Sequence, residues 1–216
     1  MEKFYLSFSS GKDCILALDT LVKQGLQPAG LITSLNEEIN RSWFHGVPEG
    51  ILKSAATALN LPLVIVKTDG KNYEKQMLKA LKEIQKEGIS SICFGDIDIE
   101  ENGDWDKRIA QEAGLTPYLP LWQCERREIV NQFLSSGYQA IIKTVSKKSG
   151  IPVEFLGRSL DDAFIDYLIK NDLDVCGENG EYHTLVIDGP LFSKPVTFKT
   201  QGIYESSQAY SLIIEE

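Results

Sequence analysis

The residues most able to perform chemistry form a run near the N-terminus, Ser9-Ser10-Gly11-Lys12-Asp13-Cys14, called here the 9–14 loop. It lies between an apolar segment that predicts a strand and a segment with helical spacing. A turn at such a junction leaves backbone N–H groups at the positive end of a helix dipole, where they attract anions. Gly11 lets the backbone approach a ligand, and Lys12 adds a positive charge. The run therefore predicts a phosphate site; the alternative is a serine-rich helix start with a surface lysine.

This run is not a loop of the G-x-x-x-x-G-K-[ST] type. Leu6 takes the place of the first glycine, and Asp13 takes the place of the magnesium-binding hydroxyl. These two differences argue against an ATPase that transfers the γ-phosphate.

A second candidate group, Gly95 and Asp96, follows an apolar segment at residues 91–94. Ligands of parallel sheets collect beyond the carboxyl ends of the strands, so Asp96 is expected to face a ligand crevice, where it could hold magnesium or a substrate amine. The side chain of Arg108 either reaches back to this site or pairs with a nearby acid. The acids after Asp98 are interpreted as a solvated loop: Glu100, Glu101, Asp104 and Asp106.

A third group is a run rich in glycine and acids at residues 176–184, called here the 176–184 loop. Its glycines and asparagine predict an irregular backbone, and turn formation alone does not require so many acids. The candidate side chains and backbone positions are Gly177, Glu178, Asn179, Gly180, Glu181 and His183. His45 and Gly46 form a smaller group after the second apolar segment, either at the site or as a loop histidine bonded to backbone.

Alternating strands and helices must position these groups. The expected strands are residues 3–8, 29–34, 63–66, 91–94 and 117–121, with helices at 14–24, 49–59, 73–87 and 105–113 between them. This alternation predicts an α/β fold with a five-stranded parallel sheet and helices on both faces. After residue 122 the pattern changes to helices at 125–134 and 161–169 and strands at 138–145, 184–187, 196–198 and 209–214. We therefore expect a nucleotide-binding domain at residues 1–122 and a smaller α+β part at 123–216.

Composition limits the function further. The 216 residues include 22 Lys and Arg against 31 Asp and Glu, a net charge of −9, which disfavours binding to nucleic acid or to an anionic membrane. No apolar run is long enough to span a membrane, so a cytoplasmic location is the expectation. The four cysteines are scattered without zinc-ligand spacing, as expected of small apolar residues in a reducing compartment.

The 9–14 loop resembles the pyrophosphate loop of the PP-loop ATP pyrophosphatases, which cleave ATP between the α and β phosphates. The usual form is Ser-Gly-Gly-Lys-Asp-Ser, so this chain departs from it at Ser10 and Cys14. The resemblance implies a Rossmann-like (HUP-type) fold, ATP bound by the 9–14 loop with Gly95 and Asp96, and Mg²⁺ held by Asp13 and Asp96.

The G-E-x-G-E-Y pattern of the 176–184 loop and D-G-P-L-F at residues 188–192 resemble the diphthine-ammonia ligase branch of these enzymes. The resemblance covers residues 3–192 and departs from the branch at Asn179 and His183. It implies that a substrate carboxylate is adenylated and that ammonia then displaces AMP. The catalytic residues it implies are Lys12, Asp13, Glu178, Glu181 and His183. The substrate-binding residues it implies are His45, Gly46, Asp96, Gly177, Glu178, Asn179, Gly180 and Glu181.

The expected partners are ATP, ammonium and a carboxylate acceptor, which is diphthine on elongation factor 2 if the source organism makes it. A homodimer is compatible with the sequence. Two alternatives stay open: another adenylating PP-loop enzyme that acts on a small carboxylic acid or a nucleobase, and a non-catalytic sensor of adenine nucleotides. The products formed from ATP distinguish them.

Overall fold

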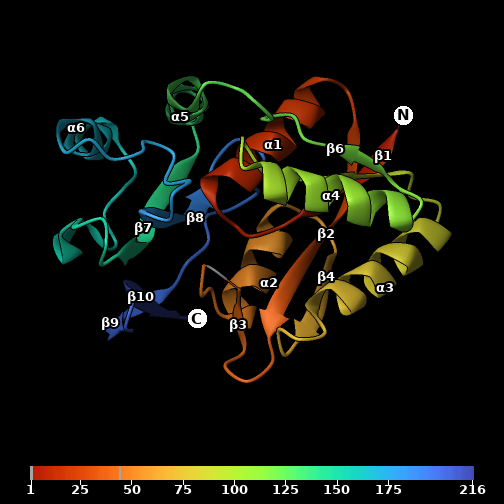
Figure 1. The fold of residues 1–216 in the computed structure, drawn as a ribbon, viewed down its shortest axis with the longest axis horizontal. Coiled ribbons are helices and arrows are strands. Elements are labelled where there is room, and N and C mark those ends of the chain that lie inside the picture. Colours follow the sequence, from red (N-terminus) through yellow and green to blue (C-terminus); the bar gives the residue numbers. More distant parts are fainter. Residues whose placement is uncertain (1, 44) are drawn as a thin grey trace.

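The parallel sheet expected in the first part of the chain is present in the computed structural model, which describes residues 2–43 and 45–216 (Figure 1). Five parallel strands lie in the order β4-β2-β1-β5-β6. Their bounds are β1 Lys3–Ser7, β2 Gln27–Asn36, β4 Leu63–Thr68, β5 Ser91–Cys93 and β6 Thr116–Tyr118. The prediction of a Rossmann-like five-stranded parallel sheet is thereby confirmed.

A sixth strand that the sequence did not indicate, β3 (Arg41–Ser42), pairs antiparallel with the end of β2. Because β4 occupies one edge of β2 over residues 31–36, β3 must use the other edge, beyond the point where β1 ends. This position brings the segment after β3 over the carboxyl end of β1.

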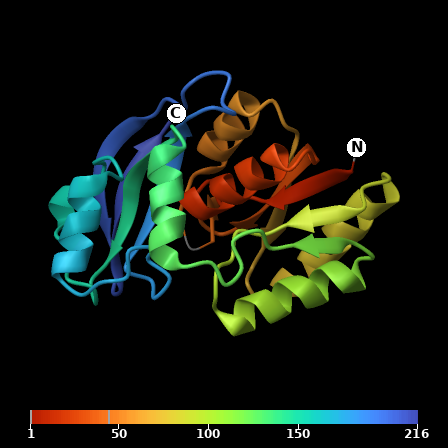
Figure 2. The ribbon, with the colours of Figure 1, turned by 90° about the horizontal axis from the view of Figure 1, so that it is seen from above.

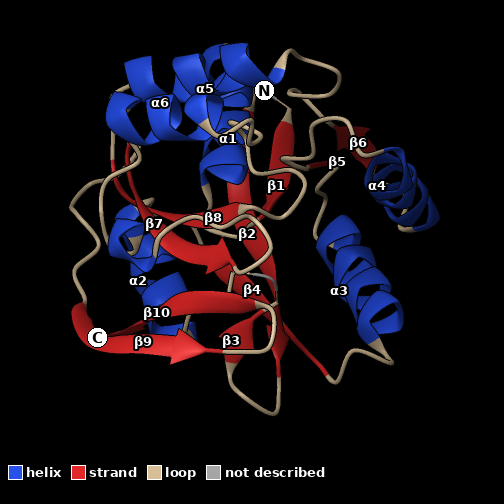
Figure 3. Ribbon diagram, turned by 60° about the vertical axis from the view of Figure 1, so that its left-hand side comes forward, coloured by secondary structure: helices blue, strands red, loops and turns tan. Residues whose placement is uncertain are grey.

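Four helices cover both faces of the sheet, as predicted. They are α1 Lys12–Lys23, α2 Glu49–Ala58, α3 Tyr73–Lys86 and α4 Glu100–Glu112. Phe4 and Leu6 of β1 belong to the cluster that contains α1 and α2, whereas Tyr5 packs with α3 and α4 on the opposite face. Figure 3 shows α3 and α4 together on one side of the sheet. The alternation of side chains along β1 thus separates two apolar layers.

The second part of the chain folds as an antiparallel sheet with strand order β8-β7-β10-β9, covered by two helices. Its elements are α5 Arg126–Ser135, β7 Gln139–Ser146, the 3-10 turn η1 Val153–Phe155, α6 Asp162–Lys170, β8 Tyr182–Asp188, β9 Lys199–Glu205 and β10 Ala209–Glu215. This is the smaller α+β part that the sequence predicts. No helix in the described part of the chain has the length and apolar character needed to cross a bilayer.

The two parts share one apolar core. The larger cluster runs from Leu6 and Leu18 of the first part to Phe133, Val145 and Leu185 of the second. Helix α5 lies next to α1 at the junction of the two sheets (Figure 2). The boundary that we place after residue 122 falls in the connection between β6 and α5 and stays a prediction.

Two element predictions were wrong. Helix α4 starts at Glu100, five residues earlier than expected, and Gly103 lies inside it, where the Trp122 ring packs against it. Acids in its first turn are favourable near the positive end of the helix dipole. Residues 196–198 form no strand; the strand is β9, whose side chains are all exposed. A strand without a buried face has no alternating pattern by which the sequence could reveal it.

Replacing Gly103 by alanine is expected to destabilise the protein by about 1–2 kcal/mol. A Cβ atom at Gly103 would overlap Cη2 of Trp122, so the ring must move. Overpacking of this kind destabilises the folded state by about 1–3 kcal/mol. The higher helix propensity of alanine offsets up to about 1 kcal/mol of this loss. Urea denaturation measures the change. If the ring is the cause, Gly103→Ala costs nothing further in a Trp122→Leu background.

Candidate functional site

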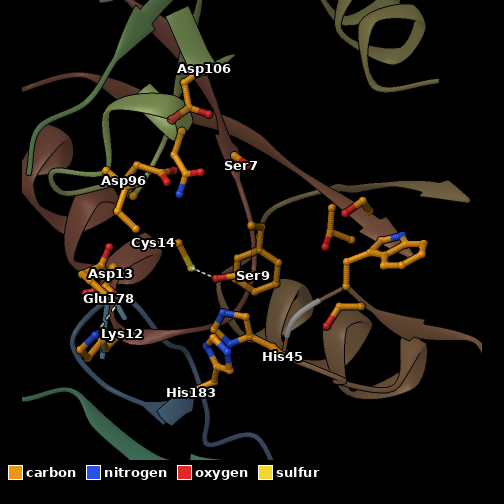
Figure 4. Close-up of a pocket in the computed structure, with 18 of the residues that line it drawn as sticks. Ser7, Ser9, Lys12, Asp13, Cys14, His45, Asp96, Asp106, Glu178 and His183 are labelled. Carbon is orange, nitrogen blue, oxygen red and sulfur yellow. Dashed lines mark hydrogen bonds and ion pairs between the residues drawn. The ribbon is translucent and has the colours of Figure 1, made fainter. Parts of the chain in front are cut away.

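A cavity of about 710 Å³ lies beyond the carboxyl ends of β1, β2 and β5, where a parallel sheet is expected to bind ligands (Figure 4). Its wall combines the 9–14 loop and α4 from the first part with the 176–184 loop from the second. The predicted site residues that line it are Ser9, Lys12, Asp13, Cys14, His45, Gly95, Asp96, Gly177, Glu178, Gly180 and His183. The wall does not include Ser10, Gly11, Gly46, Asn179 and Glu181. Ligand cavities commonly measure about 300–1,000 Å³, so a nucleotide fits.

Ser10 holds the 9–14 loop in place instead of facing the cavity. Its φ of +62° lies in the left-handed region, which explains why glycine suits this position in the pyrophosphate-loop pattern. The side chain is buried, and its hydroxyl donates to the carbonyl of Ser9 at 2.6 Å. The carbonyl of Ser10 accepts a hydrogen bond of 2.8 Å from the N–H of Val186 in β8. The second part of the chain therefore fixes the loop of the first.

Two glycines allow close approaches at the loop. A Cβ atom at Gly11 would lie 2.6 Å from Cε1 of His45, so the imidazole ring rests directly against the loop backbone. A Cβ atom at Gly95 would lie 2.8 Å from the backbone nitrogen of Cys14, which shows that the end of β5 packs on the start of α1. Gly95 therefore brings Asp96 next to the 9–14 loop.

Lys12 is buried at the start of α1. Its Nζ atom donates to Asp13 Oδ2 at 2.8 Å and to the carbonyl of Cys176, and lies 5.5 Å from the centre of the Tyr182 ring. Burial alone would lower the pKa of Lys12, but the Asp13 carboxylate outweighs it and raises that pKa above the usual lysine value. The lysine is thus a permanent cation with one of its three donors left for a ligand.

Acids form one wall of the cavity, with Asp96 above Asp13 and Glu178 in Figure 4. Burial, assisted by the charge of Asp13, raises the pKa of Glu178 to about 7. Burial also raises the pKa of Asp96. The Oδ1 atom of Asp13 is buried without a hydrogen-bond partner among the described residues. Residues 2–43 and 45–216 contain no cluster of three or more His, Cys, Asp or Glu side chains placed to hold a metal ion.

Asp106 is a member of this wall, so the interpretation of it as part of a solvated loop is wrong. It lies in α4, is only 3% exposed and lines the cavity beside Asp96. Burial and the charge of Asp96 raise the pKa of Asp106 to about 9. Its spacing from Gly103, Ile109 and Ala110, three or four residues apart, is the helical signal that could have revealed it.

Arg108, whose role the sequence left open, turns away from the cavity. It pairs with the exposed acids Glu74 and Glu112 at 2.8 and 3.3 Å. It therefore connects α3 to α4 on the protein surface and belongs to no part of the candidate site.

Asp106→Asn is expected to stabilise the protein more at pH 8 than at pH 5. The pKa of Asp106 is about 9 in the folded chain and about 3.9 in an unfolded one, so the folded state keeps a proton that the unfolded state releases. Stability is then lost as the pH rises between these values, and asparagine removes that loss. Thermal unfolding at both pH values should show a relative gain on the order of 5 °C at pH 8. An equal effect at both values would contradict the assigned pKa.

The two histidines meet at the other side of the loop. His45 comes from the segment after β3 and His183 from β8, and their ring centres are 4.7 Å apart. Burial lowers the pKa of His45 to about 4 and that of His183 to about 3. Both rings are therefore neutral at pH 7.

The 176–184 loop divides its acids between the cavity and its own interior. Gly177 and Gly180 have φ values of +76° and +82°, which hold the turn that points Glu178 at the cavity. Glu181 is buried behind the turn, where Oε1 accepts a hydrogen bond of 3.1 Å from Asn179 Nδ2. Its Oε2 has no partner among the described residues. The geometry thus separates Glu178, which a ligand can reach, from Glu181, which supports the loop.

Comparisons with known proteins show what the chain is similar to. Family models described as the diphthamide synthase N-terminal domain and the diphthamide synthase C-terminal domain match residues 2–117 and 125–214. Curated relatives named diphthine–ammonia ligase include the Homo sapiens protein, 28% identical over 231 residues, covering 94% of this chain and 85% of that protein. The Bos taurus protein is 28% identical over 225 residues, covering 92% of this chain and 84% of that protein. A solved structure described as a predicted subunit of tRNA methyltransferase from Methanocaldococcus jannaschii covers 87% of this chain and 97% of that one, with 17% identity and a TM-score of 0.47.

Proposed function

The chain belongs to the diphthamide synthase family, and on this premise we propose that it is an ATP-dependent ligase that forms an amide from a substrate carboxylate and ammonia. The carboxylate attacks the α-phosphate of ATP and releases pyrophosphate, and ammonia then displaces AMP from the acyl-adenylate. One observation carries this proposal: the 9–14 loop and Glu178 of the 176–184 loop line the same cavity. The phosphates of ATP on the loop and an acceptor beside Glu178 can therefore lie in the same cavity.

The pyrophosphate is assigned to the 9–14 loop. Lys12 keeps one donor for it, and Ser9, Lys12 and Asp13 of the loop line the cavity. The positive end of the α1 dipole lies at the same point. These groups stabilise the charge that develops on the leaving pyrophosphate.

Magnesium fits the acids beside the loop. Mg²⁺ in nucleotide sites is usually held by one or two carboxylates together with phosphate oxygens and waters. Asp13 and Asp96 both line the cavity, and the buried Oδ1 of Asp13 has no hydrogen-bond partner among the described residues. We assign these two side chains to Mg²⁺, which would neutralise phosphate charge when it binds with ATP.

Glu178 is assigned to ammonium. Its pKa of about 7 lets it attract the cation and take a proton from it near neutral pH, which prepares the nucleophile. The acceptor is assigned to the part of the cavity that His45, Gly177 and Gly180 line together with Glu178. Diphthine on elongation factor 2 is the acceptor if the source organism makes it, in the cytoplasm; otherwise another carboxylic acid takes its place.

The products of ATP test this proposal. The protein is incubated with ATP, Mg²⁺, ammonium and diphthine-bearing elongation factor 2, and the nucleotide products are separated. AMP and pyrophosphate in equal amounts, with one amide per AMP, are expected. ADP and phosphate would contradict the assignment of the 9–14 loop. Tight ATP binding without turnover with any acceptor would instead support a nucleotide sensor.

A further inference from the structure

The histidines of this chain number two, and both lie against the 9–14 loop. Figure 4 shows the rings of His45 and His183 side by side, next to Ser9. Their ring planes are inclined by 44°, and Cε1 of His45 lies where a Cβ atom on Gly11 would clash. Any anion on the loop backbone therefore has this pair as its immediate neighbour.

The hydrogen bond of His45 leaves a free acceptor on the ring. Its Nδ1 atom is 3.1 Å from the carbonyl oxygen of Thr184, which only accepts, so Nδ1 carries the proton and Nε2 has an open lone pair. Thr184 Oγ1 accepts from the backbone N–H of Lys12 at 3.0 Å. One residue of β8 thus connects the imidazole pair with the start of α1.

The charges around the pair are mostly positive. Lys12 and Asp13 face it from α1, and Lys143 faces it from β7, with Arg41 of β3 close to Lys143. Lys12 is paired with Asp13. Lys143 is buried and donates to the hydroxyl of Ser211 rather than to a carboxylate; burial, assisted by the charge of Arg41, lowers the pKa of Lys143 to about 7, so it is only partly charged at neutral pH. Burial is the main cause that keeps the pair neutral in the absence of an anion, and the charge of Lys12 lowers the pKa of both rings further.

We propose that the His45–His183 pair takes up one proton from solvent when pyrophosphate occupies the 9–14 loop, and that the resulting imidazolium becomes part of the pyrophosphate site. The proton binds a free ring nitrogen, and no other bond changes. An opposite charge within about 4–6 Å raises a pKa by about 1–3 units, and pyrophosphate carries several such charges. This inference rests on the proposed assignment of the loop to pyrophosphate.

Nitrogen NMR of the imidazole rings tests the inference directly. A chain free of tag histidines, labelled with ¹⁵N-histidine, gives signals from these two rings alone. Between pH 5 and pH 8 both rings should stay neutral without ligand. With saturating inorganic pyrophosphate, one ring should titrate with a pKa raised by at least about two units. Phosphorus NMR of the same samples reports whether pyrophosphate is bound.

The two measurements separate this inference from its premise. Bound pyrophosphate with both rings neutral down to pH 5 would overturn the proton uptake and leave the proposed function intact. Failure of pyrophosphate to bind would overturn the loop assignment, and the inference with it.

A variant gives a second readout. His45→Asn keeps a donor near the Nδ1 position toward Thr184 but cannot take a proton. Its affinity for pyrophosphate should be about tenfold weaker than that of the wild type at pH 5, because a ring pKa raised from about 4 to about 6 gives that linkage factor, and the difference should disappear by pH 8. A purely structural defect would weaken binding equally at both pH values, which would contradict the proposal. If the variant does not fold, the wild-type titration alone decides.

Discussion

Replacing Lys12 by methionine is expected to slow pyrophosphate release from ATP by about a hundredfold to a thousandfold. Methionine fills the buried space but removes the cation that faces the cavity beside Asp13. Without it, the negative charge that develops on the leaving pyrophosphate has only backbone dipoles and Mg²⁺ to stabilise it. Single-turnover formation of pyrophosphate, measured with radiolabelled ATP, gives the rate.

The same variant should shift the pH profile of amide formation. The charge of Lys12 lowers the pKa of Glu178, so Lys12→Met should raise that pKa above its value of about 7 and move the acidic limb of amide formation to higher pH. Lys23→Met, at the exposed end of the same helix, is the matched control and should leave both the rate and the profile unchanged. A Lys12→Met protein that folds and releases pyrophosphate at the wild-type rate would refute the role of this lysine.

The parts of the site that the sequence predicts are those that depend on local patterns. The 9–14 loop is bounded by an apolar strand and an amphipathic helix, so its place at the carboxyl end of β1 follows from spacing alone. Gly95 and Asp96 follow a buried strand in the same way. Lys12, Asp13, Gly95 and Asp96 line the cavity because parallel strands present their carboxyl ends at one edge of the sheet.

The parts that the sequence could not supply depend on contacts between distant segments. Nothing near His45 indicates that its ring rests on Gly11 and beside His183, since this contact needs β3 and β8 in place. The separation of Glu178 from Glu181 depends on two left-handed glycines whose φ values no pattern reveals. Their roles in catalysis stay predictions that the variants test.

The acid wall also changes how the net charge of −9 is understood. Asp106, Asp96, Asp13 and Glu178 gather along one side of a cavity assigned to a polyanion, with Lys12 as their buried cation. Burial and mutual repulsion raise the pKa of Asp106, Asp96 and Glu178, so part of this charge is absent until a cation arrives. Magnesium and ammonium are the cations that the proposed reaction supplies.

Glu178→Gln is expected to reduce amide formation by about a hundredfold to ten-thousandfold while pyrophosphate release falls less than tenfold. Glutamine keeps the shape of the side chain but cannot take a proton from ammonium. In the wild type, amide formation should rise with pH up to about 7, because the raised pKa leaves Glu178 protonated below that value. The variant should lose this rise. Parallel assays of pyrophosphate and amide at pH 5.5 to 8.5 measure both steps.

Glu181→Gln separates the two acids of the 176–184 loop. Glu181 bonds to Asn179 and does not line the cavity, and glutamine keeps the oxygen that accepts from Asn179, so this variant should change amide formation by less than tenfold, with the pH rise retained. The contrast is decisive because both substitutions remove one carboxylate from the same loop. If Glu181→Gln abolishes the pH rise and Glu178→Gln does not, the base is Glu181, and the loop must rearrange when ATP binds.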